Sequence, residues 1–444
     1  MRRIGMNKRT CLLWIPLAVS GTILLTGAGF AQDGAPGQYI VELNNDAVPE
    51  VVATHHGLAP QFVYRKTIKG FAGAIPPGQL KALAQDQRVL SITPDRVMKA
   101  IGKPTGESAP TAPQVVPAGV QRVGAAPGNV GFKGAGVGVA VVDTGLDFKH
   151  ADLQPLGTAS FTAYGTSAQD DNGHGTHCGG IVAARNNSRD VVGVAPEATL
   201  YAVKVLDRSG SGTDSSIMAG LEWIATEANQ VSPAIRVVTM SLGRQGTVND
   251  NPALRTAIQN VAALGISVVV AAGNDPKLEV TSEVPAAYPE VMAIASTTAR
   301  DGTSQSRSFS GYIKADTASY FTTDGAFDET TRQGVTISAP GEDVENISKA
   351  GLIQSVGILS TKLSGGTTRM SGTSMATPHV AGVIALMYEK ALTQGTSIDP
   401  ETVRVKIATG ASKAGVAPLA SPTTSYTPDN DLEGIVSAPG ALAQ

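Results

Sequence analysis

Four short motifs in this sequence carry side chains that could do chemistry together. Asp143 ends an apolar run, His174 lies in a glycine-flanked histidine motif, and Ser374 follows a Gly-Thr pair before another apolar stretch. In an Asp–His–Ser set, the histidine takes the proton of the serine hydroxyl and the carboxylate orients the histidine. Asn274 follows a fourth apolar run and could donate its amide to a developing oxyanion. Together these residues predict nucleophilic attack on a carbonyl group.

Each motif also has an ordinary structural interpretation when it is taken alone. Thr373 or Ser374 could cap a helix, and Pro378 suits a position near the start of that helix. Asp143 and Asn274 could be turn residues, because Asp and Asn are common in turns. The chain order Asp, His, Asn, Ser favours the catalytic interpretation over four unrelated turns and caps.

The histidine motif allows a further alternative, which is metal binding. His174, His177 and Cys178 fall at positions i, i+3 and i+4, so they would share one side of a helix. A zinc site needs three or four ligands and an ordered second shell, and the sequence contains no other His/Cys pair. Buried histidines with a purely structural role are the other alternative. No metal-ligand set is predicted.

The elements that must position these motifs follow an alternating pattern from residue 136 onward. Short runs of residues that are apolar throughout are typical of buried parallel strands, and segments with a helical pattern lie between these runs. The predicted strands are 136–142, 200–206, 235–240 and 267–272, and the predicted helices are 179–185, 215–227 and 252–264. We therefore predict an α/β fold with a doubly wound, mainly parallel sheet and helices on both faces. Residues 312–333 are interpreted as a surface insertion.

Residues 32–105 have a different pattern, which indicates a small domain of their own. The predicted strands are 38–43, 61–65, 70–75 and 89–92, and the predicted helices are 48–56 and 79–86. The order β-α-β-β-α-β indicates an α+β ferredoxin-like fold. A polar, proline-marked stretch at 103–110 is typical of a linker.

Residues 1–31 are interpreted as a signal peptide for export. Four basic residues precede an apolar run, and Gly29-Phe30-Ala31 supplies small residues before a cut. An uncleaved membrane anchor is the alternative, although polar and glycine interruptions in the run favour cleavage. Cys11 would leave with the signal, so Cys178 would have no disulfide partner.

The composition of the chain limits which classes of protein and which partners fit this sequence. The chain has 444 residues, of which 42% are hydrophobic and 16% charged, as expected for a globular protein with a large core. Its net charge of −3 argues against a nucleic-acid-binding surface. Residues 32–105 carry eight Lys/Arg against six Asp/Glu, while the rest of the chain beyond them is acidic. The small domain could therefore pair electrostatically with the larger one.

With these motifs in view, the sequence resembles the subtilisin-like serine peptidases (the subtilase family), with a proteinase K-like cysteine after the second histidine. The resemblance implies a signal at 1–31, an inhibitory propeptide at 32–105 and a catalytic domain at 106–444. It implies that Ser374 is the nucleophile and His174 the general base and then acid. Asp143 would orient the imidazole, and Asn274 would be an oxyanion donor.

The resemblance also implies which segments bind substrate. Two edge segments would pair with an extended peptide, and a third would form one wall of the pocket for the side chain before the cut. These residues are Gly210, Ser211, Gly212, Ser241, Leu242, Gly243, Ala272 and Gly273. Arg244 and Asp214 depart from the family pattern and put the subsite preference in doubt. Asp275 could favour a basic residue at the cut.

We therefore expect a secreted endopeptidase, made as a zymogen that cleaves itself near residues 100–112. Its partners would be protein or peptide substrates and its own propeptide, with no nucleic acid and no stable membrane association after signal removal. The chemistry would need no cofactor, and structural calcium is possible without identifiable ligands. The alternatives are a catalytically silent binding protein with this fold, and an esterase, which the missing Gly-x-Ser-x-Gly elbow disfavours.

Overall fold

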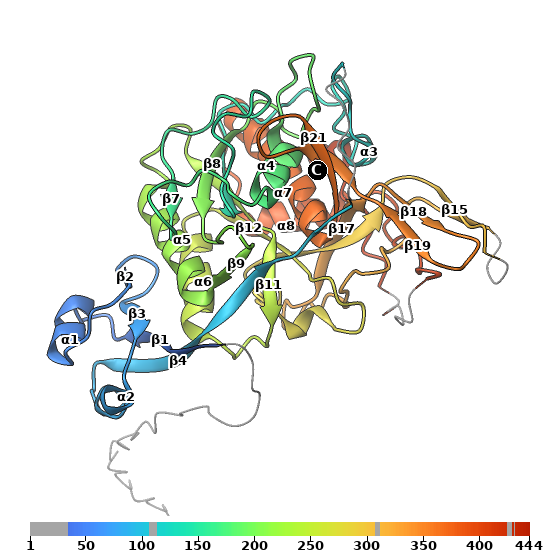
Figure 1. Cartoon of the computed structure of the whole chain (residues 1–444). Coiled ribbons are helices and arrows are strands. Elements are labelled where there is room, and N and C mark those ends of the chain that lie inside the picture. The colour runs from blue at the N-terminus through green and yellow to red at the C-terminus, as the bar shows by residue number, and fades with distance from the viewer. Residues whose placement is uncertain (1–33, 106–112, 307–310, 424–428, 430) are drawn as a thin grey trace, which may run out of the picture. The chain divides into compact units, whose positions relative to one another are not determined.

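The structure is a computed structural model that describes residues 34–105, 113–306, 311–423, 429 and 431–444 (Figure 1). The predicted signal peptide lies outside these residues, as do residues 106–110 of the predicted linker. No helix in the described part of the chain is both long and apolar enough to cross a membrane.

A seven-stranded parallel sheet forms the centre of the larger region, in the order β17-β14-β12-β10-β6-β8-β7. Its strands are β6 (Gly138–Asp143), β7 (Phe161–Thr162), β8 (Thr199–Lys204), β10 (Ile235–Met240), β12 (Ser267–Ala271), β14 (Met292–Thr298) and β17 (Val335–Glu342). The four predicted strands are therefore confirmed within a few residues. Strands β14 and β17 were not predicted, because their Ser, Thr, Pro and Gly residues interrupt the apolar pattern.

Helices cover both faces of this sheet, which confirms the doubly wound fold. Val139 and Val141 point into one core cluster, which also holds residues of α4 (His174–Ala183) and α7 (Thr373–Thr393). Ala140 and Val142 point to the opposite face, where α5 (Asp214–Glu227) and α6 (Pro252–Ala263) pack. Successive residues of a strand point to opposite faces, so a strand that is apolar throughout needs a helix on each side.

Shorter elements complete the larger region. They are α3 (Ala118–Arg122), β9 (Ser211–Thr213), β11 (Leu242–Gln245), η1 (Val280–Ser282), β13 (Glu283–Val284), β15 (Gly302–Thr303), β16 (Tyr312–Ile313), β18 (Val344–Ile347), β19 (Ile353–Val356), β20 (Ile358–Thr361), β21 (Thr367–Ser371), α8 (Pro400–Thr409) and α9 (Ala438–Ala443).

The small domain has the predicted β-α-β-β-α-β order. Its elements are β1 (Gly34–Leu43), α1 (Pro49–His55), β2 (Phe62–Tyr64), β3 (Gly70–Ala74), α2 (Pro77–Leu83) and β4 (Val89–Ala100). The strands pair antiparallel in the order β4-β1-β3-β2. Strand β4 runs far beyond the predicted 89–92 and continues between β9 and β11 of the larger region (Figure 1). A short strand, β5 (Lys103–Pro104), follows it and pairs with β21.

The interpretation of 312–333 as a surface insertion is wrong for its middle part. Thr317, Thr322 and Thr323 are at most 3% exposed. The Thr323 hydroxyl donates to the carbonyl of Asp275 at 3.0 Å and accepts from the N–H of Asp275 at 3.1 Å. Hydrogen bonds of this kind let a polar, Thr-rich segment lie inside the molecule without the cost of unpaired groups. The segment therefore supports the loop that carries Asn274.

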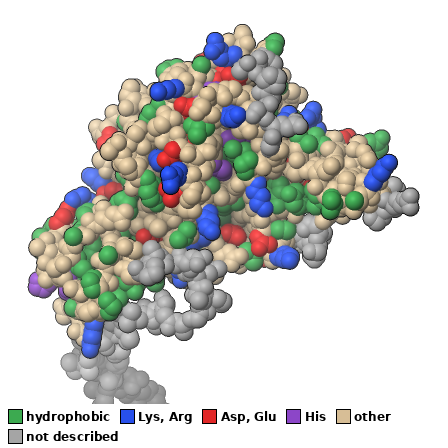
Figure 2. Space-filling model, in the orientation of Figure 1, with side chains coloured by type: hydrophobic (Ala, Val, Ile, Leu, Met, Phe, Trp, Pro, Cys, Tyr) green, Lys and Arg blue, Asp and Glu red, His purple; other side chains and the backbone are tan. Residues whose placement is uncertain are grey.

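Charged side chains of both signs are interspersed over the face shown in the space-filling view (Figure 2). A surface of this kind favours solubility without creating a strong field of one sign.

Candidate active site

The ends of a strand and a helix bring Asp143 and His174 together. Asp143 is the last residue of β6, and His174 is the first residue of α4. The Nδ1 atom of His174 lies 2.8 and 2.9 Å from the two carboxylate oxygens of Asp143. Both side chains are buried. The carboxylate fixes the ring orientation and leaves Nε2 as the nitrogen that faces a substrate.

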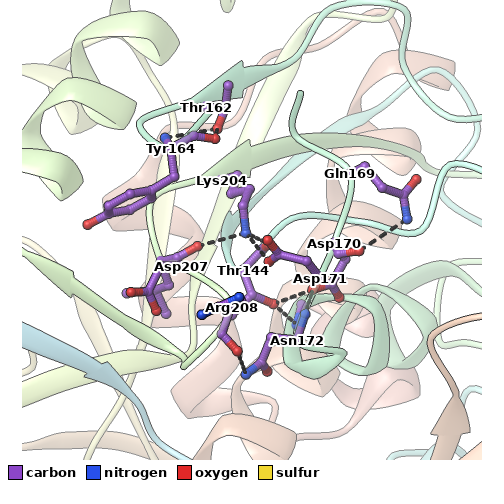
Figure 3. A network of polar contacts seen from close by, with 12 residues as sticks. Thr144, Thr162, Tyr164, Gln169, Asp170, Asp171, Asn172, Lys204, Asp207 and Arg208 are labelled. Carbon is purple, nitrogen blue, oxygen red and sulfur yellow. Dashed lines mark hydrogen bonds and ion pairs between the residues drawn. The ribbon is translucent and has the colours of Figure 1, made fainter. Parts of the chain in front are cut away.

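Asp170 holds these two ends in register (Figure 3). Its Oδ1 accepts from the hydroxyl of Thr144 and from the backbone N–H groups of Asn172 and Gly173, each at 2.9 Å. Its Oδ2 accepts from the N–H of Thr176 at 2.9 Å and from its hydroxyl at 2.6 Å. One buried carboxylate thus ties the residue after Asp143 to the first turn of the helix that begins with His174. The sequence analysis missed Asp170, although it lies only four residues before the histidine.

Buried Lys204 extends this network (Figure 3). Its Nζ atom donates to the carbonyls of Thr144 at 2.6 Å and Leu206 at 3.0 Å, and lies 2.6 Å from Oδ1 of Asp171. Burial of an ammonium group is costly unless its N–H groups donate hydrogen bonds, and here they have three oxygen acceptors. The Asn172 amide also donates to the carbonyl of Arg208 at 3.0 Å, which fixes the chain just before the predicted edge residues 210–212.

Ser374 is the second residue of α7 and lies close to His174. The Sγ atom of Cys178 lies 3.9 Å from Nδ1 of His174 and 3.5 Å from the carbonyl oxygen of Ser374. The Ser374 hydroxyl donates to the carbonyl of Ser241 at 3.0 Å. Among the described residues, Nε2 of His174 has no hydrogen-bond partner. The hydroxyl would therefore have to turn from Ser241 to His174 before it could be activated.

Pro378 lies inside α7, so the prediction that it stands near the helix start is wrong by about one turn. A proline has no N–H to donate to the carbonyl four residues earlier, which here is that of Ser374. This carbonyl instead accepts from the Ser241 hydroxyl at 2.9 Å and from Cys178. The helix begins at Thr373 because Gly372, with φ +153°, turns the chain there.

Thr373 does not cap the helix, contrary to the capping expectation, but fixes the Asn274 amide. Its N–H and its hydroxyl each donate to Oδ1 of Asn274 at 3.0 Å. The Nδ2 atom of Asn274 is therefore turned outward, and it donates to the carbonyl oxygen of Ile101 at 3.2 Å. The backbone N–H of Ser374 donates to the same oxygen at 3.3 Å. Two donors thus converge on one carbonyl directly beside the Ser374 hydroxyl.

The predicted edge segments hold the end of the small domain. In the register of the strands, Met98 and Lys99 of β4 lie opposite β9, and Lys99 and Ala100 lie opposite β11. The N–H of Ala100 donates to Gly210 at 2.9 Å, and that of Ile101 donates to Ser241 at 3.1 Å. The predicted residues that this tail contacts through backbone pairing are Gly210, Ser211, Gly212, Ser241, Leu242 and Gly243.

The predicted wall residues differ from each other. Ala272 is fully buried in the hydrophobic core, and its N–H donates to Ile294 at 3.0 Å. Gly273 has a φ of +123°, and a Cβ placed on it would lie 3.0 Å from Cγ of Glu283. Glycine is required at this position, because the Thr323 hydroxyl and the Glu283 side chain both lie beside it. The sequence analysis missed Glu283.

Arg244 and Asp214, the two residues that depart from the family pattern, form an ion pair with each other. Arg244 donates to both carboxylate oxygens of Asp214, at 2.7 and 2.9 Å, and both side chains are buried. The amide of Asn251 donates to the same carboxylate at 2.9 Å. Two parallel N–H···O bonds are the strongest form of this pair, and each charge makes burial of the other tolerable.

Electrostatics at the histidine favour a strong base. Burial alone lowers the pKa of His174, but the Asp143 carboxylate raises it, and the result lies well above the usual value. Burial raises the pKa of the Cys178 thiol, so this side chain stays protonated. His177 points elsewhere, with Nε2 3.1 Å from the carbonyl of Ile358. Asp143, His174 and Cys178 are near one another, but a thiol and a carboxylate engaged by an imidazole fit hydrogen bonding better than metal ligation.

The sequence analysis also missed a second cluster of polar groups, around Gln114 and Asp152. Nε2 of Gln114 lies 2.6, 3.3 and 3.2 Å from the carbonyl oxygens of Arg185, Arg189 and Val191, so three carbonyls converge on this amide. Asp152 is fully buried, its Oδ1 has no partner among the described residues, and burial raises its pKa to about 6. The 185–191 loop also reaches Asp152, because Val191 donates its N–H to Oδ2 at 3.2 Å. Calcium prefers such oxygen ligands, and main-chain carbonyls leave no mark in a sequence.

Comparison with known proteins agrees with this geometry. Residues 134–430 match the model of the subtilase family, and residues 38–100 match that of the peptidase inhibitor I9 family. The chain belongs to the subtilase family and is a serine-type endopeptidase that carries an inhibitor-type propeptide domain.

Several curated relatives cover most of the chain. M-protease from Shouchella clausii (strain KSM-K16) is 35% identical over 366 residues, which is 82% of this chain and 80% of that protein. Subtilisin E from Bacillus subtilis (strain 168) is 32% identical over 402 residues, or 86% and 90% of the two chains. Subtilisin Savinase from Lederbergia lenta is 40% identical over 278 residues, or 62% and 86%. Catalysis in this family needs no cofactor.

Proposed function

We propose that this protease is a zymogen that cuts its own Ile101–Gly102 bond with Ser374 as nucleophile. The observation that carries the proposal is the position of the Ile101 carbonyl, whose oxygen accepts from Asn274 and from the Ser374 N–H. The chain before this bond pairs with β9 and β11, and the chain after it pairs with β21. An extended segment held on both sides of a carbonyl that faces a nucleophile is bound as a substrate.

The proposed chemistry follows from these contacts. The Ser374 oxygen forms a bond to the Ile101 carbonyl carbon while Nε2 of His174 takes the hydroxyl proton. The carbonyl oxygen becomes negative, and Asn274 and the Ser374 N–H stabilise it together with the positive end of the α7 dipole. Asp143 stabilises the imidazolium that forms.

Collapse of this intermediate breaks the bond to Gly102. A Cβ placed on Gly102 would lie 3.0 Å from Nε2 of His174, so the leaving residue faces the acid that must protonate its nitrogen. His174 gives its proton to this amine, and Ile101 remains as an ester on Ser374. Water, deprotonated by His174, then releases the Ile101 carboxylate and restores the serine. The same steps would cut peptide bonds of other proteins.

After this cut, residues 32–101 would stay in the cleft as an inhibitor. The strand pairs of β4 with β9 and β11 do not depend on the Ile101–Gly102 bond. The catalytic part would then begin at Gly102, four residues before the boundary predicted from the sequence. Protein and peptide substrates would enter once the propeptide is removed.

The basic and apolar pattern of residues 1–31 supports export, so we place the mature enzyme outside the cell. We also propose that the oxygens around Asp152 hold a structural calcium ion. The unpartnered Asp152 oxygen supports this proposal, because the 185–191 loop reaches Asp152 and its carbonyls, which accept from the Gln114 amide in this structure, would supply further oxygen ligands. The ion would stabilise the 185–191 loop and would take no part in the chemistry.

Replacement of Ser374 with Ala tests this proposal. The variant should remain uncut through residue 101, hydrolyse no casein and take no label from a serine-directed fluorophosphonate. The wild-type protein should take the label, and its new amino terminus should begin at Gly102. Self-cleavage by the Ser374→Ala protein would refute the assignment of the nucleophile. A mature terminus elsewhere would refute the assignment of the bond, and absence of labelling in the wild type would favour the silent binding protein.

A further inference from the structure

Resting on the proposed cleft, the geometry points to Glu283 as the residue that selects substrates with lysine or arginine immediately before the cut bond. We propose that its carboxylate lies at the far side of the pocket for that side chain, where it pairs with the ammonium or guanidinium group.

The pocket is outlined by the residue that now occupies it. A Cβ placed on Gly243 would lie 2.9 Å from Cδ1 of Ile101 and 3.2 Å from the carbonyl oxygen of Val284. The Ile101 side chain therefore packs against β11, beside the β13 strand that ends in Val284. Glu283 is the other residue of β13, so the carboxylate stands one residue from this contact.

The other side of the pocket brings Glu283 to the oxyanion donor. Gly273 directly precedes Asn274, and a Cβ on Gly273 would lie 3.0 Å from Cγ and 3.1 Å from Cδ of Glu283. The acidic side chain thus lies against Gly273, whose neighbour holds the Ile101 carbonyl. A substrate residue whose carbonyl is held by Asn274 and whose side chain passes Gly243 would extend toward this carboxylate.

No group in the described part of the protein satisfies the Glu283 carboxylate. The residue is 7% exposed, and its side chain makes no described hydrogen bond or salt bridge. Its pKa is raised to about 7, because burial and the neighbouring Asp275 carboxylate raise it by more than Arg244 lowers it. Ionisation of a carboxylate in so buried a residue is costly, and a charged ligand lowers that cost.

The nearest cation is already engaged by other acids. Arg244 donates to Asp214 through two nitrogens and to Asp250 through Nη1 at 3.3 Å. Asp275, the acid that the sequence suggested for this role, accepts instead from the N–H of Lys277 at 3.0 Å in a local turn. Glu283 is therefore the acid that is left for a substrate cation.

Ile101 itself does not need to satisfy this preference. Strand pairing holds the Ile101–Gly102 bond in the active site of the same chain. A segment tethered in this way reacts at a high effective concentration even when its side chain fits the pocket poorly. Substrates from solution have no such tether, so their cleavage depends on the contact with Glu283.

The test uses the processed enzyme and two fluorogenic peptides that differ only in Lys or Met before the cut bond. At pH 9 the wild-type enzyme should favour the Lys peptide by roughly 10- to 100-fold in kcat/KM, as expected for one enclosed charge pair. Glu283→Gln should lose most of that factor, so that the Lys and Met peptides become comparable substrates. Asp275→Asn, the matched control, should keep the wild-type ratio.

A second measurement needs no substitution. Between pH 5.5 and pH 8.5 the Lys-to-Met ratio of the wild type should rise roughly tenfold as Glu283 ionises, which the Asp275 carboxylate opposes and the Arg244 guanidinium favours. A ratio that is flat with pH, or equal in the wild type and Glu283→Gln, would overturn the inference. If the wild type cleaves neither peptide and takes no fluorophosphonate label, the proposed function fails and this inference fails with it.

Discussion

The small domain and the larger region differ in how much of each hydrophobic core is formed by that region's own residues. The larger region has two extensive clusters, one on each face of its parallel sheet. The small domain has a single small cluster, between its sheet and helices α1 and α2. Its other sheet face, with Ile40, Tyr64 and Ala72, packs into the cluster that contains α5 and α6. The small domain therefore completes its core with residues of the enzyme.

Polar contacts follow the same division. The carboxylate of Asp95 accepts from the N–H and hydroxyl of Ser215 at 2.9 and 2.6 Å, and Tyr64 donates to the carbonyl of Ser215 at 3.0 Å. Glu222 of α5 accepts N–H groups from the loop that contains Thr67. Removal of the enzyme would expose an apolar face and leave these groups unpaired, and so small a domain has little stability to spare. The propeptide domain therefore depends on contacts with the enzyme for its stability, whereas the enzyme forms most of its core from its own residues.

Asn274→Ala should give the largest loss. Removal of one oxyanion donor typically lowers turnover by about 100- to 1000-fold. We expect the same factor for self-cleavage and for an added peptide, with KM nearly unchanged, because both bonds would use one cleft. Rates of precursor conversion and of peptide hydrolysis would check this. Unequal losses would show that the propeptide is cut by a different geometry.

Self-cleavage should depend on pH through His174. Its pKa in the precursor lies well above the usual value because of Asp143, and only the neutral ring can take the Ser374 proton. Since the protonated form is inactive, the rate should fall about tenfold per pH unit on the acid side of a midpoint above 6.5. Precursor conversion followed by gel electrophoresis from pH 5 to 10 measures this. A midpoint below 6.5 would contradict the assignment.

Glu222→Gln should weaken the hold of the enzyme on the cut propeptide. The carboxylate accepts from the N–H groups of Lys66 and Thr67, each at 2.8 Å, and hydrogen bonds to charged groups contribute about 1.5–3 kcal/mol. We expect roughly tenfold faster appearance of activity after self-cleavage. Glu227→Gln on the same helix is the control, because Glu227 has no described side-chain hydrogen bond to the small domain. Equal lag times in the two variants would contradict the comparison of the domains.

Asp152→Asn should have the smallest effect and should act on the enzyme region alone. At a hundredfold excess over Kd, calcium adds about 2.7 kcal/mol, or roughly 5 °C in Tm. The raised pKa of about 6 means that ionised Asp152 costs stability as pH rises through 6, so calcium should help more at pH 8 than at pH 5. Scanning calorimetry of the wild type and the variant, with magnesium as the control ion, would measure this. A calcium shift that survives in the variant would place the ion elsewhere.

The sequence alone determined the main strands, the helices between them and the order of the small domain, and it predicted the site residues Asp143, His174, Asn274 and Ser374. Apolar periodicity and glycine-flanked motifs are local, so they can be read along the chain. It could not show that β4 continues into the cleft, because residues 93–100 alternate only weakly and are held by partners far along the chain. It also placed Pro378 wrongly, since what replaces its missing hydrogen bond comes from Ser241.

Tertiary structure decided the rest. Asp170 gains its role from backbone and side-chain donors that fold against it, Thr373 from the Asn274 amide oxygen to which it donates, and Asp152 from the loop whose Val191 N–H reaches it. The ion pair between Arg244 and Asp214 turned two departures from the family pattern into one feature. A hydrogen bond, a buried charge or a pocket depends on which groups meet in space, and the spacing of residues along the chain does not fix that.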